Sequence, residues 1–142
     1  MSEQNFKNHS RYIPLWHFVI PAMLLALLIG SIVNLVNSDA HTHYSAALIV
    51  VIIVVLIGFY WYIRWFALRA QDRAIRAEEN FRYYILTGQP MDPQLRMRQI
   101  IALRFASDEE LPGLAKRAVD EKLSSKSIKQ SIKKWKPDYN RV

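Results

Sequence analysis

The side chains that could carry chemistry are few in this chain. Asp39, His41 and His43 lie within one short polar stretch, and carboxylate and imidazole groups are common ligands for zinc or nickel. A closed tetrahedral site needs a fourth ligand, and none follows nearby. We interpret the stretch as a polar turn, and we predict no metal and no other cofactor.

Three adjacent carboxylates at positions 108 to 110 form the other acidic cluster. Consecutive helix residues point in different directions, so these groups would not converge on one atom. Carboxylates that follow a serine, here Ser107, are typical of a helix start. The chain has no cysteine and no glycine-rich phosphate loop, and we predict a protein that is not an enzyme and has no catalytic residues.

Two long apolar stretches are the elements around which the rest of the chain is arranged. Residues 15–36 and 44–63 contain no Asp, Glu, Lys or Arg. About twenty helical residues cover the roughly 30 Å hydrocarbon core of a bilayer, and the aromatic residues between 59 and 65 suit the headgroup level. The pattern predicts two transmembrane helices joined by the turn 37–43. A signal peptide is the alternative for the first stretch, but its apolar run is too long and a second span follows.

The charge distribution predicts the topology. The chain has 142 residues and a net charge of +7, and residues 64–142 hold seventeen Lys and Arg against ten Asp and Glu. The tail 1–14 is also basic through Lys7 and Arg11, which we expect at anionic lipid, whereas the turn carries only Asp39. Cytoplasmic segments are enriched in Lys and Arg, so we expect both termini in the cytoplasm.

One face of the first span is built from small residues at four-residue spacing. Small side chains let helices approach closely in lipid, and an amide can hydrogen-bond across the contact. We predict that this face packs against the second span or a second copy of the protein, although small residues that merely face lipid would give the same pattern. The predicted packing residues are Ala22, Ala26, Gly30 and Asn34.

Residues 64–87 lack proline and glycine until Gly88 and predict that the second helix continues into the cytoplasm. Apolar residues recur there at three- and four-residue spacing and predict one buried face. The members of that face are Phe66, Ala70, Ala74, Ala77, Phe81 and Ile85.

Residues 92–136 predict a small cytoplasmic helical region, followed by the tail 137–142. Asp92 and Pro93 would open a helix that runs to about Ala106. Ser107 and Glu110 fit a capping box for a helix over 108–123. Ser124 or Ser125 would cap a last helix over 126–136.

The last predicted helix carries the most basic surface of the chain. In one alternative this helix packs on the preceding helix through Ile128, Ile132 and Trp135. In a second, it lies on the inner leaflet, and in a third, it forms a helix-turn-helix on DNA. The third alternative is disfavoured because lysines dominate where Arg, Asn or Gln would read bases. The predicted lipid or partner surface is Lys126, Lys129, Lys133, Lys134, Trp135 and Lys136.

Two long stretches resemble a known family. They are QNFKNHSRYIPLWHF at the start and RQIIALRFASDEELPGLAKRAVDEKLSSKSIKQSIKKWKPDYNRV at the end. The chain resembles an uncharacterised family, a domain of unknown function, of small two-span inner-membrane proteins from Bacteroidota. The resemblance implies a multi-pass protein of the bacterial inner (cytoplasmic) membrane with a periplasmic turn, and it carries over no site residues.

These features together predict an all-α membrane protein, a two-span transmembrane hairpin followed by a small cytoplasmic helical region. The expected function is that of a membrane-anchored interaction or scaffold protein. Its expected partners are the anionic headgroups of the bilayer and a second copy or another membrane protein. The alternatives are a membrane-tethered nucleic-acid-binding regulator, although nucleic acid is the less favoured partner, and an accessory subunit of a transporter or envelope assembly.

Overall fold

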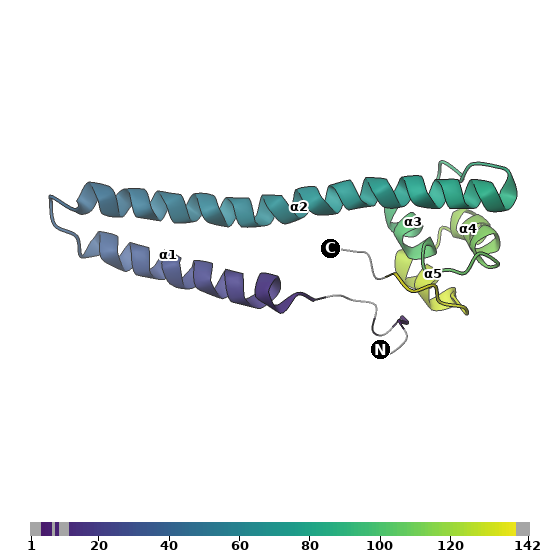
Figure 1. Ribbon diagram of the computed structural model, residues 1–142, viewed down its shortest axis with the longest axis horizontal. Helices are drawn as coiled ribbons and strands as arrows, with labels where there is room; N and C mark the ends of the chain where they lie inside the picture. Colours follow the sequence, from purple (N-terminus) through teal and green to yellow (C-terminus); the bar gives the residue numbers. More distant parts are fainter. Residues whose placement is uncertain (1–3, 7, 9–11, 139–142) are drawn as a thin grey trace. The chain divides into compact units, whose positions relative to one another are not determined.

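The computed structural model describes residues 4–6, 8 and 12–138, and every regular element in them is helical. The all-α prediction is therefore confirmed for the described residues. The chain divides into two compact units, Arg11–Phe66 and a unit made of Met1–Ser10 and Ala67–Val142. Helix α2 (His43–Thr87) contributes to both units (Figure 1). The expected lipid contacts of Lys7 and Arg11 lie outside the described residues.

The first helical stretch begins with a π-helical turn, Leu15–Val19, and continues as α1 (Ile20–Val36). Pro21 lies in the first turn of α1. A proline ring crowds the carbonyl one turn before it, and a wider π turn gives that carbonyl room. Helical structure therefore begins before Pro21, at Leu15.

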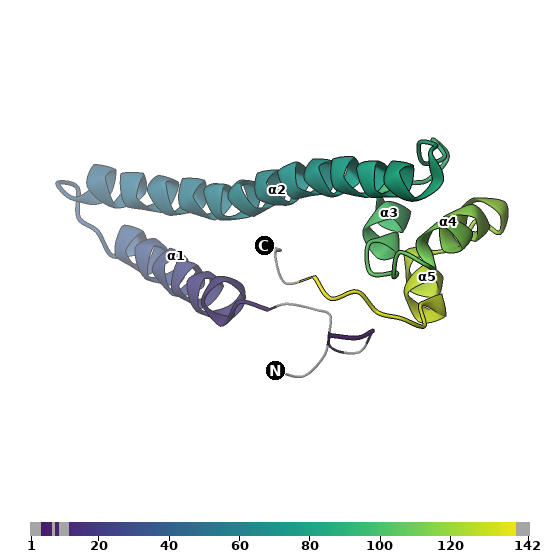
Figure 2. The same ribbon diagram turned by 45° about the vertical axis from the view of Figure 1, so that its right-hand side comes forward.

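Asp39 organises the turn between α1 and α2. Its carboxylate accepts hydrogen bonds from the Thr42 backbone N–H (2.9 Å) and hydroxyl (2.8 Å) and from the His41 N–H (3.1 Å). A carboxylate in this position satisfies backbone donors at the start of a helix, here the start of α2. The turn sends α2 back alongside α1, as two views show (Figures 1 and 2).

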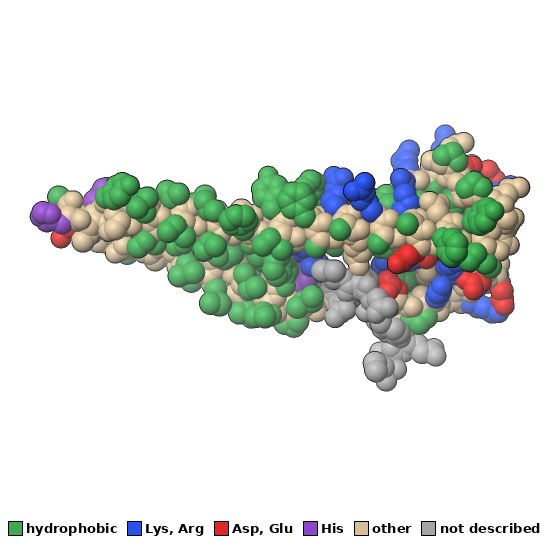
Figure 3. Space-filling model, turned by 45° about the horizontal axis from the view of Figure 1, so that its top comes forward, with side chains coloured by type: hydrophobic (Ala, Val, Ile, Leu, Met, Phe, Trp, Pro, Cys, Tyr) green, Lys and Arg blue, Asp and Glu red, His purple; other side chains and the backbone are tan. Residues whose placement is uncertain are grey.

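Almost the whole apolar surface of the hairpin faces outward. Among its described residues, only Ser31, Ala46 and Ile53 are buried. Hydrophobic side chains cover both helices of this unit (Figure 3). Leu15–Val36 and His43–Thr87 are each long and apolar enough to cross a membrane, by length and composition.

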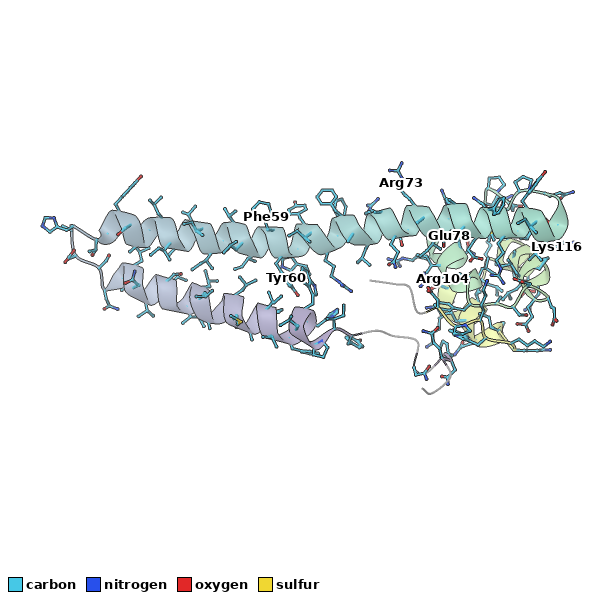
Figure 4. All side chains as sticks on the ribbon, in the orientation of Figure 1. Phe59, Tyr60, Arg73, Glu78, Arg104 and Lys116 are labelled. Carbon is cyan, nitrogen blue, oxygen red and sulfur yellow. The ribbon has the colours of Figure 1, made fainter. Side chains whose placement is uncertain are left out.

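An aromatic contact joins the start of the first helical stretch to α2. The rings of Trp16 and Tyr60 stack with 4.7 Å between their centroids, and the Tyr60 hydroxyl donates to the Trp16 carbonyl at 2.9 Å. Tyr60 points toward α1, whereas Phe59 points away from it (Figure 4). The aromatic residues predicted for the headgroup level therefore include one that also packs the hairpin.

The second unit has its own hydrophobic core. Helices α3 (Met97–Leu103), α4 (Leu111–Asp120) and α5 (Ser125–Ser131) pack together and against α2. The largest fully buried side chains come from α3, α4, α5 and the residues between them. They are Leu103, Phe105, Leu111 and Ile128.

The prediction for residues 92–106 was wrong at its start, because α3 begins only at Met97. Asp92 forms a local turn instead of capping a helix: its carboxylate accepts from the Gln94 N–H at 2.8 Å. The extended path that follows places Met91 and Leu95 in the core. Burial of these two side chains outweighs the local helix signal.

The predicted helices 108–123 and 126–136 are both shorter in the structure, Leu111–Asp120 and Ser125–Ser131. Ser107 accepts from Glu110 and Leu111 through its backbone carbonyl, not its side chain. Ser124 caps α5 as expected, its hydroxyl accepting from the Ser127 N–H at 3.1 Å. After Ser131 the chain is extended, and the Ser107 and Lys136 N–H groups bond to the carbonyls of Lys134 and Phe105 (3.2 and 2.7 Å). The backbone partners of the segment after α5 are therefore Phe105 and Ser107, which lie far from it in sequence.

The predicted buried face of residues 64–87 was also wrong. Ile75 and Glu79 are the buried residues of this part of α2, and Tyr83 packs against the core. The residues named from the sequence, Phe66, Ala70, Ala74, Ala77, Phe81 and Ile85, are exposed or half-exposed. The apolar stripe predicted on this helix therefore does not belong to the core of the described residues.

Candidate functional site

The six residues of the predicted basic surface are divided between helix α5 and the extended segment that follows it. Lys126 and Lys129 are on α5, whereas Lys133, Lys134 and Lys136 are on the extended segment after it. The other residue, Trp135, is half-buried and stacks on Phe105 with 4.7 Å between ring centroids. Lys129 also lies over the Phe105 ring. Its Nζ is 5.4 Å from the ring centroid, which is close enough for a cation–π attraction.

The apolar face of α5 is not available to a membrane. Ile128 has no exposed surface, and Ile132 packs against the same core. The contacts of α5 are therefore those of a helix packed in a bundle. Exposed lysines surround it, namely Lys126, Lys133, Lys134 and Lys136. A surface of this kind attracts anions by charge and does not insert into lipid.

Two glutamates hold the extended lysine segment in place. The Glu110 carboxylate accepts the backbone N–H groups of Lys133 and Lys134 at 3.1–3.3 Å. Glu109 pairs with the Lys134 ammonium group and raises the pKa of that lysine. The acidic cluster read from the sequence as a helix start thus fixes the C-terminal segment and neutralises part of its charge.

Arg82 ties α2 to the segment before α4. Its guanidinium donates to Glu79 (3.0 Å), to Asp108 (2.7 Å) and to the Ala106 carbonyl (2.7 Å). The Arg82 and Glu79 side chains are only 12% and 11% exposed. This hydrogen bond to Arg82, with its charge, holds the pKa of Asp108 below the usual range. The sequence contains no local signal for the contact, because it joins residues 26 positions apart.

A cavity of about 400 Å³ lies where the start of α3 meets the end of α4. Its lining includes Arg96, Arg98 and Lys122 and the hydroxyl-bearing Ser124 and Ser125, and no carboxylate. None of the three cations has an ion pair within residues 12–138. Three unneutralised cations beside hydroxyl donors can hold an anion such as a phosphate group.

Gln99 shapes the wall of this cavity. Its amide donates to the carbonyls of Ala118 (3.0 Å) and Leu123 (2.9 Å), and its oxygen accepts the Arg96 N–H (2.8 Å). The end of α4 also places Lys122 in a left-handed conformation, with φ 48°. The Leu123 N–H bonds to Ala118 and the Lys122 N–H to Val119, which is the Schellman pattern that usually has glycine where Lys122 stands.

The predicted packing residues of the first span do not form the buried contact of the hairpin. Ala22, Ala26, Gly30 and Asn34 are all exposed, and the neighbouring Ser31 is buried instead. Ala26, Gly30 and Asn34 line a shallow groove between α1 and α2, and Ile49 and Ile53 of α2 complete it. Their predicted role in packing against another helix stays a prediction, and Ala22 lies outside the groove.

Among the described residues there is no group of three or more His, Cys, Asp or Glu side chains that could hold a metal ion. The arrangement offers cations, hydroxyls and an apolar hairpin, which suit binding of anions and anchoring in lipid. No curated protein and no solved structure matches the chain. The match to a family described as of unknown function (DUF6526) covers residues 1–142, and the chain belongs to that family.

Proposed function

We propose that this protein is a membrane-anchored interaction protein of the bacterial inner membrane. The observation that carries the proposal is the exposed apolar surface of the hairpin, where the described residues bury only Ser31, Ala46 and Ile53. Soluble proteins rarely expose apolar patches above a few hundred Å², and hydrocarbon is the solvent that matches such a surface. The charge distribution of the sequence favours both termini in the cytoplasm.

The C-terminal unit is the part that we assign to interaction. Its partner of matching charge is the anionic headgroup, recognised by the C-terminal lysines and by the cavity of Arg96, Arg98 and Lys122. The packed apolar face of α5 supports contact through charge without insertion. The scaffold function then consists in holding a folded unit close to the inner leaflet.

Membrane anchoring is tested on the full chain by extraction of membranes with alkaline carbonate. We expect the protein to remain in the pellet and to be released only by detergent. Placing a charge at the middle of one span, with Val51→Arg, should reduce retention, because an arginine at the centre of a span costs about 2.5–3.5 kcal/mol. Release of the natural chain by carbonate would contradict the anchor.

The headgroup contact is tested by lysine acetylation of the full chain in nanodiscs, read by mass spectrometry. We expect Lys122, Lys126 and Lys133 to react more slowly with anionic than with neutral lipid, and the difference to vanish at high salt. Lys116, an exposed lysine of α4 outside both groups, is the matched control (Figure 4). Equal protection of Lys116, or no dependence on lipid charge, would overturn this part of the proposal.

A further inference from the structure

A single side of α2 in the second unit is apolar and uncovered. Its residues alternate in spacing by four and three positions, which is the seam of a coiled coil. Phe81 is 67% and Tyr84 54% exposed, and the alanines before them are exposed as well. The members of this seam are Ala70, Ala74, Ala77, Phe81 and Tyr84.

The seam is separate from the face that packs the core. Ile75 and Glu79 turn toward the core of α3, α4 and α5, and at 100° per residue the seam is centred well over 90° away from them. Arg73 projects from the side of α2 opposite to α3–α5 (Figure 4). A second helix can therefore approach from the Arg73 side of α2, whereas Ala74, Glu78 and Phe81 at the other edge of the seam border grooves that Lys136 also lines.

We propose that the seam binds the same seam of a second copy of this chain, in parallel. The charges beside it support this occupant. Arg73 stands immediately before the seam residue Ala74, and Glu78 stands immediately after the seam residue Ala77. In a parallel coiled coil, a residue before the seam on one helix faces the residue five positions later on the other helix, so Arg73 would face Glu78. Neither side chain has an ion pair within the described chain, so each is available to the other copy, and the symmetry forms the pair twice.

The antiparallel arrangement does not use these charges. It would place like flanking positions opposite one another, so that Arg73 would meet Arg73 or Asn80, and Glu78 would meet Glu78, Gln71 or Ile85 of the other copy. Parallel pairing alone matches opposite charges. The orientation also rests on the proposed membrane anchor, because two copies with one topology in one membrane meet with their helices parallel.

The seam residues explain how close such copies would come. Alanines at three successive seam positions let two helix backbones approach closely in the part nearer the hairpin. Phe81 and Tyr84 then fill the wider part near Gly88, where each ring meets its own counterpart, and aromatic pairs add to the area buried. The assembled seam would remove from water the two largest apolar side chains that this face exposes.

The natural chain has no cysteine, so one substitution creates a specific cross-linking probe. Ala77→Cys puts a thiol in the seam, where symmetric Cβ atoms can approach to the roughly 4 Å that a disulfide requires. Arg76→Cys puts one at an exposed position on α2 outside the seam and is the matched control. In membranes treated with a mild oxidant, we expect a disulfide-linked dimer from Ala77→Cys and little from Arg76→Cys.

Charge reversal then tests the orientation in the Ala77→Cys chain. We expect Arg73→Glu alone, and Glu78→Arg alone, to weaken self-association about tenfold, which corresponds to about 1.4 kcal/mol, because two attractions become two repulsions. The combined reversal should restore cross-linking. No dimer, equal dimer from both thiol positions, or no rescue by the combined reversal would overturn the proposal. Retention in the carbonate pellet reports on the anchor separately, so the two failures can be told apart.

Discussion

Replacement of Arg82 by methionine is the sharpest perturbation of the contact between α2 and the C-terminal helices. Methionine keeps much of the length of the side chain and removes its charge and its donors. The change leaves the 11% exposed carboxylate of Glu79 without its cation. It also removes the donor of the Ala106 carbonyl, which belongs to a residue with no exposed surface.

The cost follows from these two orphaned groups. Breaking a buried ion pair by removing one partner destabilises a protein by about 3–5 kcal/mol, and Asp108 adds little because its side chain is 62% exposed. We therefore expect Arg82→Met to destabilise the C-terminal unit by about 3 kcal/mol. Hydrogen exchange of the full chain in nanodiscs should show amides of α3 and α4 exchanging roughly 100-fold faster.

The chain offers a matched control in Arg117, which pairs with Glu121 on the surface of α4. These side chains are 53% and 50% exposed, so Arg117→Met should have little effect on stability. Glu79→Met combined with Arg82→Met should recover part of the loss, since no buried charge remains. Equal effects of Arg82→Met and Arg117→Met would show that burial of the ion pair does not decide the cost.

Three further predictions concern the same unit. The contact with Arg82 lowers the pKa of Asp108. The contribution of this contact to stability should therefore be complete above the ordinary pKa of 3.8 and should be lost as the pH falls through the lower folded pKa. Asp108→Asn should flatten that part of an acid titration followed by circular dichroism. Lys122→Gly should raise the free energy of unfolding by about 1 kcal/mol, because glycine adopts φ 48° without strain, as denaturant titration would show. Ile128→Ala should cost about 3 kcal/mol and Ile132→Ala clearly less, since only Ile128 has no exposed surface; both are measured by the same titration.

The sequence predicts the helical stretches of this protein better than their ends. The apolar stretch 15–36 matches the helix Leu15–Val36, because an unbroken apolar run is a local signal. The ends of α3 and α5 depend on distant groups. Glu110 takes the backbone donors after α5, and no pattern around residue 131 indicates that contact.

The face of a helix that packs is also a non-local property. Residues 64–87 contain an apolar stripe through Phe81, and periodicity alone assigns that stripe to a core. The structure instead buries Ile75 and Glu79, because Arg82 neutralises Glu79 and the core lies on their side. The cavity of Arg96 and Lys122 was not predictable for the same reason, since α3 and α4 bring its cations together.

The most direct test of the membrane anchor is thiol labelling of single-cysteine chains in spheroplasts with a membrane-impermeant maleimide. Ala40→Cys probes the exposed turn, Val51→Cys the middle of a span and Lys116→Cys the C-terminal unit. We expect Ala40→Cys to be labelled from outside, Lys116→Cys only after permeabilisation, and Val51→Cys only after denaturation. Labelling of Ala40→Cys and Lys116→Cys from the same side, or free labelling of Val51→Cys in the membrane, would contradict the anchor.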